Sequence, residues 1–113
     1  MLRPLNFGEL SKRDLIPQAI IDKPMSYFAK QGFALVHDSD ALDSFEGIAL
    51  LLDDLPFALI HHRGNPNNET TVYLTRDFGH NIDKISASIR DILVALNISS
   101  ESLIWERRND PDL

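Results

Sequence analysis

Histidine is the residue type in this sequence best suited to chemistry near neutral pH, because a neutral imidazole can take a proton, accept a hydrogen bond or bind a metal ion. The sequence contains His37, His61, His62 and His80. His61 and His62 are adjacent, but neighbouring side chains of a strand point to opposite faces of the sheet. His80 follows the next predicted strand, which places it about 20 Å from His62 at the rise of an extended chain. We therefore expect no shared metal site and no cofactor.

A second group of polar residues surrounds the loop 63–69, which is rich in asparagine and also contains glycine and proline. His61, Arg63 and Glu69 combine a base, a cation and a carboxylate, which suits anion binding or acid–base hydrolysis. Arg107, just after the last predicted strand, could join them at one end of a sheet. The sequence has no serine elbow, phosphate loop or dinucleotide fingerprint to support catalysis. We therefore expect a solvated rim of charge here, and a catalytic or ligand-binding role for His61, Arg63 and Glu69 is the alternative interpretation.

Composition limits the classes of protein to consider. With 113 residues, of which 43% are hydrophobic, the chain matches one ordinary globular domain, and we expect a single domain spanning 1–113. The absence of cysteine excludes disulfides and thiolate metal sites and is typical of a reducing compartment, so we expect a cytoplasmic protein. The net charge of −6 opposes binding to nucleic acid or to an anionic membrane. No apolar run approaches the roughly 20 residues of a membrane helix, so we expect no membrane segment.

Acidic residues are concentrated in the segment 38–54, which contains no lysine or arginine. Its carboxylates belong to Asp38, Asp40, Asp43, Glu46, Asp53 and Asp54. If these groups shared one surface, they would attract a basic protein partner. The alternative is that they only solvate surface loops.

The centre of the sequence predicts a β-hairpin. Two apolar runs, 46–52 and 55–62, are separated by Asp53-Asp54, a pair that tolerates tight turns. With these two residues as the loop, one face carries six large apolar side chains: Ile48, Leu50, Leu52, Leu55, Phe57 and Leu59. The opposite face is also apolar, through Ala49, Leu51, Ala58 and Ile60. Because such a patch rarely stays exposed, we expect either the N-terminal arm or a second copy of the chain to cover it, the latter making it a homodimer interface.

The flanking sequence supplies the other elements. Apolar residues at helical spacing predict an amphipathic helix over 81–96, with Asn81 as its N-cap and Asn97 closing it in a left-handed conformation. Pro17 should interrupt regular structure in 10–21, which we expect as an irregular arm. The remaining predictions are a short helix at 24–32, strands at 33–37, 70–76 and 103–105, and a frayed tail at 109–113.

Together these elements predict an α+β fold, in which an antiparallel meander of four to five strands packs against the C-terminal helix at 81–96, with a short N-terminal helical layer. On this fold we expect a small non-enzymatic interaction or regulatory module, homodimeric through the second sheet face. The alternative is a small enzyme or ligand-binding protein that uses the polar cluster around the loop 63–69. A flat apolar face buried by symmetry favours the module, and a deep pocket with converging polar groups favours the alternative.

Overall fold

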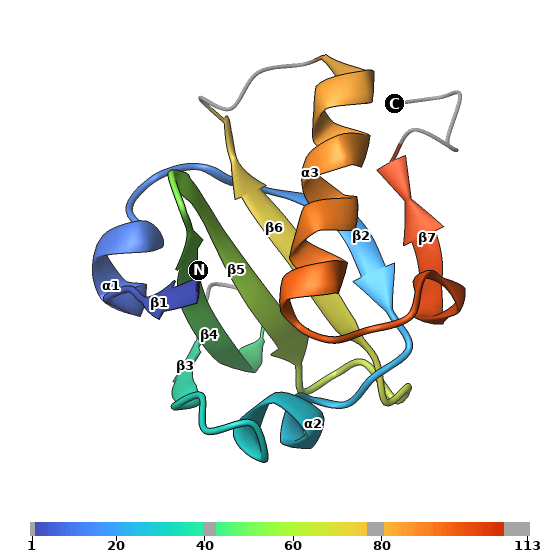
Figure 1. Cartoon of the computed structure of the whole chain (residues 1–113). Helices are drawn as coiled ribbons and strands as arrows, with labels where there is room; N and C mark the ends of the chain where they lie inside the picture. Colours follow the sequence, from blue (N-terminus) through green and yellow to red (C-terminus); the bar gives the residue numbers. More distant parts are fainter. Residues whose placement is uncertain (1, 40–42, 77–80, 108–113) are drawn as a thin grey trace.

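The computed structural model of the chain describes residues 2–39, 43–76 and 81–107. In these described residues, seven strands form one sheet with antiparallel pairings, and one long helix crosses one of its faces (Figure 1). The strands are β1 (Leu2–Pro4), β2 (Leu15–Ile21), β3 (Val36–Ser39), β4 (Ser44–Leu52), β5 (Leu55–His62), β6 (Thr70–Thr75) and β7 (Leu103–Glu106). The helices are α1 (Phe7–Leu10), α2 (Met25–Ala29) and α3 (Ile82–Ala95), and a 3-10 turn spans Ser100–Ser102. The predicted α+β class is confirmed, whereas the prediction of four to five strands is wrong.

The hairpin of β4 and β5 has the predicted register. Leu52 pairs with Leu55, Leu50 with Phe57 and Ile48 with Leu59. Asp53, the first residue of the turn, has φ 53°, a left-handed conformation that aspartate tolerates better than most residues do. The two aspartates therefore set the pairing of the two longest strands.

Strand order in the sheet is β1-β4-β5-β6-β2-β7, and β3 pairs with β4 beside β1. β1 pairs with the end of β4 at Leu50–Leu52, and β3 pairs with the other end at Ser44–Gly47. The strand predicted at 33–37 is therefore real but begins three residues later. Predicted strands at 70–76 and 103–105 are confirmed as β6 and β7.

The prediction of an irregular arm at 10–21 is wrong, because β2 occupies its second half and lies between β6 and β7. Proline is tolerated in β2 for two reasons. The register against β6 shifts between Pro17 and Ala19, which marks a bulge. In addition, β7 pairs with β2 only from Ala19 onward, so the proline side of β2 faces no ladder that needs its missing N–H.

Both predicted ends of α3 are confirmed. Oδ1 of Asn81 accepts a hydrogen bond from the Lys84 backbone N–H at 3.0 Å, and Asn97 has φ 60° beyond the last turn. The predicted arrangement, a meander packed against this C-terminal helix with a short N-terminal helical layer, does not match the structure well. Because β2 and β7 extend the sheet past β6, α3 lies over the middle of the sheet (Figure 1). The N-terminal region contributes only two short helices beside its strands.

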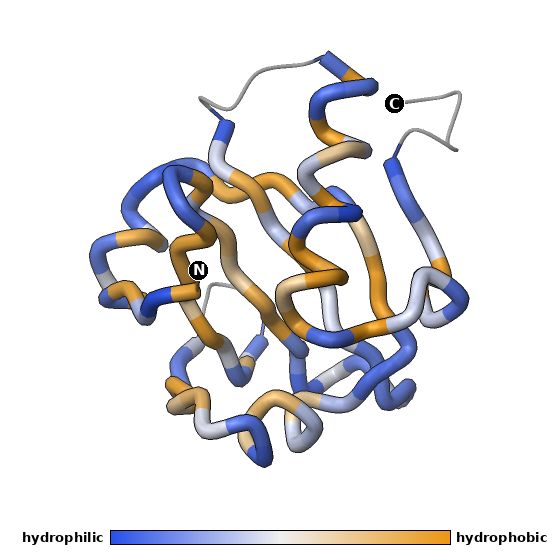
Figure 2. The backbone as a smooth tube through the Cα atoms, in the orientation of Figure 1, coloured by the Kyte–Doolittle hydropathy of each residue, from blue (hydrophilic) through white to orange (hydrophobic). Residues whose placement is uncertain are grey.

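The main core lies between α3 and the sheet. The buried side of α3 presents Ile85, Ile89, Ile92 and Leu93. These side chains belong to the same buried cluster as Leu50, Phe57 and Leu59. Figure 2 shows the hydrophobic stretches gathered in the strands and the hydrophilic ones in the connecting loops. Burial of these side chains is the main free-energy gain that holds the helix on the sheet.

A second cluster covers the other face of the sheet. Phe7 and Leu10 of α1 are each 4% exposed and pack with Ala49, Ala58 and Ile60. The close approach depends on Gly47, since a Cβ at that position would lie 2.5 Å from Cε2 of Phe7. The missing side chain of residue 47 therefore makes room for the ring that anchors α1.

This contact gives the first testable prediction. Gly47→Ala should lower the free energy of unfolding by about 1 to 3 kcal/mol, the usual cost of overpacking. Most of that cost should vanish in a Phe7→Ala background, because the added methyl group then meets no ring. Urea melts of both single variants and the double variant measure the coupling. An equal cost of Gly47→Ala in both backgrounds would contradict this packing.

Candidate functional site

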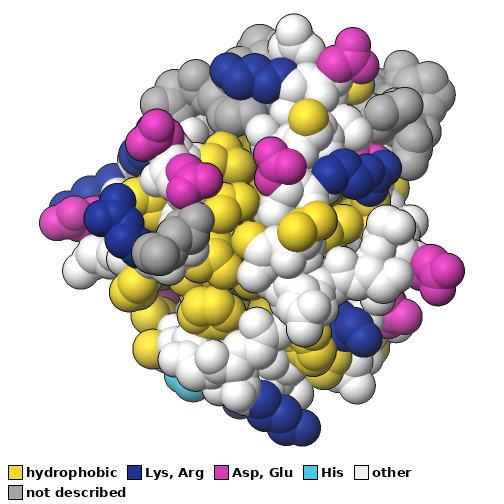
Figure 3. All heavy atoms as spheres, in the orientation of Figure 1, with side chains coloured by type: hydrophobic (Ala, Val, Ile, Leu, Met, Phe, Trp, Pro, Cys, Tyr) yellow, Lys and Arg dark blue, Asp and Glu magenta, His cyan; other side chains and the backbone are white. Residues whose placement is uncertain are grey.

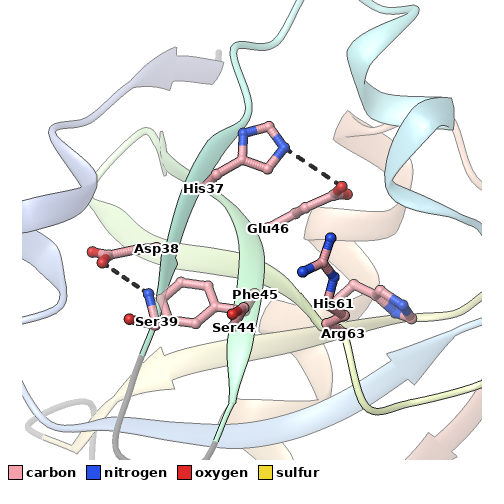
Figure 4. Close-up of a pocket in the computed structure, with 8 residues that line it drawn as sticks. All are labelled: His37, Asp38, Ser39, Ser44, Phe45, Glu46, His61 and Arg63. Atoms are coloured by element: carbon pink, nitrogen blue, oxygen red, sulfur yellow. Dashed lines mark hydrogen bonds and ion pairs between the residues drawn. The ribbon is translucent and has the colours of Figure 1, made fainter.

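The pairing of β3, β4 and β5 places polar side chains on one face at one end of the sheet. His37, Glu46 and His61 form one row of paired residues. Ser39 pairs with Ser44, one step further toward the end of the strands. Because side chains two residues apart share a face, both rows lie on the same side of the sheet. The cavity there has a volume of about 540 Å³ and is lined by His37, Asp38, Ser39, Ser44, Phe45, Glu46, His61 and Arg63 (Figure 4).

The ring of His61 is half-buried and has a fixed orientation. Its Nδ1 lies 2.8 Å from the backbone oxygen of Glu69. A carbonyl oxygen only accepts hydrogen bonds, so Nδ1 must carry the proton. In the neutral ring, Nε2 then presents a lone pair that can accept a hydrogen bond from a ligand. The loop backbone thus selects the tautomer of His61.

Arg63 stands at the start of the loop and is held through its backbone. Its N–H donates to the backbone oxygen of Ser44 at 2.8 Å, and the next N–H, of Gly64, donates to the carboxylate of Asp43. The side chain of Arg63 is exposed and lines the cavity. A fixed backbone with an exposed guanidinium can present a planar, forked donor to a carboxylate or phosphate.

Glu69 contributes differently from the prediction. Its carboxylate accepts a hydrogen bond from Nδ2 of Asn65 at 3.0 Å, within the loop. Its role at the cavity is that of the backbone carbonyl that orients His61. Two of the three predicted residues, His61 and Arg63, therefore line the same cavity, and Glu69 is not among the described residues that line it.

Arg107 does not join this group. Its Nε donates to the backbone oxygen of Pro17 at 2.9 Å, and its guanidinium lies over the ring of Trp105. Because β7 is three places from β5 in the sheet, the two regions are about 14 Å apart on strand spacing alone.

The sequence interpretation missed the residues that β3 and β4 bring to the cavity. Nε2 of His37 lies 3.5 Å from Oε1 of Glu46, an ion pair only when the imidazole is protonated. The hairpin register, extended to its open end, would have placed Glu46 opposite His61. No signal in the sequence places His37 at the cavity, because the sequence does not show that the strand containing His37 pairs with β4.

His62 lies on the other face, as the alternation along a strand predicts. Its ring packs against Phe45 with ring centroids 5.5 Å apart. Within residues 2–39, 43–76 and 81–107, no group of three histidine, aspartate or glutamate side chains is arranged to hold a metal ion. His80 and its predicted distance from His62 lie outside the described residues.

The predicted dimer interface is largely internal. Ala49, Ala58 and Ile60 are at most 6% exposed, because α1 covers them, and Leu51 is half-buried between its pairing partners Arg3 and Pro56. Of the two covers expected from the sequence, the chain's own N-terminal segment is the one found. The assignment of these residues to a contact with a second copy is therefore corrected, and association through another surface stays a prediction.

The acidic segment 38–54 does not form one surface either. β4 separates Asp43 and Glu46 at one end from Asp53 and Asp54 at the other, and nine residues of strand span about 30 Å. Asp40 lies outside the described residues. A basic partner would meet these carboxylates as two separate groups.

Comparisons with protein-family models, with curated proteins and with solved structures give no match. Among the described residues, no helix combines the length and the apolar character needed to cross a membrane. The function must therefore be inferred from the geometry of the cavity itself.

Burial of Ala58 gives a second prediction. Ala58→Glu should destabilise the fold by about 3 to 5 kcal/mol, because the new carboxylate would lie beneath α1 without a partner. Circular dichroism melts of wild type and variant measure this loss of stability. Light scattering of both proteins shows whether the molar mass changes, as it would if a dimer dissociated. A folded variant with half the molar mass of the wild type would instead support the original assignment of Ala58 to a dimer interface.

The tautomer of His61 gives a third testable prediction. In protein labelled with ¹⁵N, the neutral ring should show a protonated Nδ1 and an unprotonated Nε2, because only that form donates to the Glu69 carbonyl. Long-range ¹H–¹⁵N correlation spectra distinguish the two nitrogens, and the exposed His37 provides an internal comparison. A proton found on Nε2 of neutral His61 would show that the hydrogen bond is absent.

Proposed function

We propose that this chain is a small ligand-binding protein whose ligand is a small organic anion that also carries an amino or hydroxyl group. The observation that carries the proposal is that Arg63, whose side chain is exposed, and His61, whose ring is oriented by the Glu69 carbonyl, line one cavity. Its volume of about 540 Å³ is within the range of small-molecule sites. The sequence offered the same two residues as its alternative interpretation.

The chemistry of the lining defines the ligand class. Arg63 supplies donors for a carboxylate or phosphate, and the hydroxyl groups of Ser39 and Ser44 can donate as well. Nε2 of neutral His61 and the carboxylate of Glu46 accept hydrogen bonds. A ligand with only anionic oxygens would leave these acceptors without donors, at a cost in affinity. A hydroxy acid or an amino acid satisfies both sets.

In this proposal the protein binds its ligand and does not convert it chemically. Among the described residues, neither serine hydroxyl in the lining is hydrogen-bonded to His61, so the geometry gives no activated nucleophile. The homodimeric module predicted from the sequence has lost its main support, because the face on which it depended is covered by α1.

The fourth prediction tests the site. Aspartate and malate should bind more tightly than succinate or sulfate, because only the first two offer a hydrogen-bond donor to His61 and Glu46 near neutral pH. Arg63→Gln should weaken binding about tenfold or more by removing a charge-assisted pair, and Arg63→Lys should restore part of it. NMR titration that follows residues 37, 46, 61 and 63 gives both the affinity and the location.

Arg76→Gln is the matched control, because it removes the same charge from an exposed residue paired with Asp14. Titrations in which none of the four compounds shifts the cavity residues at millimolar concentration would refute the proposal. Equal weakening of binding by Arg63→Gln and Arg76→Gln would show that the ligand responds only to the net charge of the protein and not to this site.

A further inference from the structure

α3 leaves part of its own sheet face thinly covered. A helix is about 10 Å wide and strands lie about 4.8 Å apart, so one helix covers roughly two strands. Leu2, Leu52 and Leu55, from β1, β4 and β5, pack against the core and remain partly exposed. Figure 3 shows the hydrophobic surface that results beside the helix, bordered by acidic side chains.

A groove runs between α3 and the turn that joins β4 to β5, with a volume of about 770 Å³. Its lining from the turn and the strands includes Leu52, Leu55 and Pro56. Its other wall is a stripe of α3 at helical spacing, formed by Lys84, Ser88, Asp91 and Ala95, with Val94 beside it. Val94 is 80% exposed, although it is a large aliphatic side chain that lines this groove.

The charged residues that line this groove are Asp53, Asp54 and Asp91 and the two cations Arg13 and Lys84. Asp54 on the turn and Asp91 on α3 stand on opposite walls, and no described side chain makes an ion pair or hydrogen bond with either. Asp53, Arg13 and Lys84 also line the groove, and each already takes part in an interaction within the protein. The two uncompensated charges are therefore both negative, and they flank an apolar floor.

We propose that this groove is a docking site for an amphipathic helix of another protein, with aliphatic residues on one face and lysine or arginine at its borders. Such a helix, lying beside α3 at the usual spacing of 8 to 10 Å, would complete the helical layer over β4 and β5. Its aliphatic side chains would cover Leu52, Leu55 and Val94, and its cations would meet Asp54 and Asp91. The acidic side chains of the groove disfavour two other kinds of partner. A second copy would bring the same carboxylates against each other, and an anionic lipid surface would be repelled.

The fifth prediction uses a fluorescein-labelled synthetic peptide of 18 leucine and lysine residues in an amphipathic helical pattern. By fluorescence anisotropy, the wild-type protein should bind it, and the leucine–glutamate counterpart should not bind. The double variant Asp54→Asn/Asp91→Asn should bind about tenfold more weakly, and Val94→Ser should weaken binding several-fold. The double variant Asp22→Asn/Glu9→Gln removes two exposed acids elsewhere and should bind like the wild type.

Each other result would overturn the proposal. Absence of binding at 100 µM peptide excludes a site for this class of partner. Equal weakening by the two double variants, or no effect of Val94→Ser, means that only net charge attracts the peptide. Light scattering of the free protein completes the set, since a wild-type dimer that Val94→Ser dissociates would identify a second copy as the occupant.

Discussion

The pairing of β4 with β5 is the constraint on which the rest of the structure depends. A one-residue slip in this hairpin would move every side chain of one strand to the opposite face of the sheet. The register that the aspartate turn sets at one end places Ile48 opposite Leu59 in the core and Glu46 opposite His61 at the cavity. Core and candidate site are therefore two parts of one ladder, and neither can form in another register.

Because both faces of this hairpin are apolar, each needs its own cover. Large aliphatic side chains face α3, whose buried stripe matches them in size. The other face carries small residues, and a short helix approaches it closely enough for Phe7 to lie over Gly47. The difference in side-chain size between the two faces thus decides which face takes the long helix and which takes the four-residue one.

The two surfaces to which we assign binding lie at opposite ends of the same hairpin and differ in chemistry. At the open end, Arg63 faces acceptors and hydroxyl groups in a polar cavity. At the turn end, Asp54 borders an apolar groove beside α3. One suits a small polar anion and the other a basic, amphipathic segment, because the exposed guanidinium of Arg63 lines the first and the carboxylates of Asp54 and Asp91 line the second.

Local pattern alone determined the α+β class, the hairpin with its register, and α3 with both of its ends, because turn chemistry, strand alternation and helical spacing are properties of neighbouring residues. The tertiary structure decided what those patterns could not reach. Pro17 argued locally against a strand, yet the bulge and the late start of β7 made room for it between β6 and β7. α1, rather than a second copy, covers Ala58, and β3 brings His37 beside Glu46 in the lining of the cavity. Each of these depends on contacts between segments far apart in the sequence, whose free energy outweighs local preference.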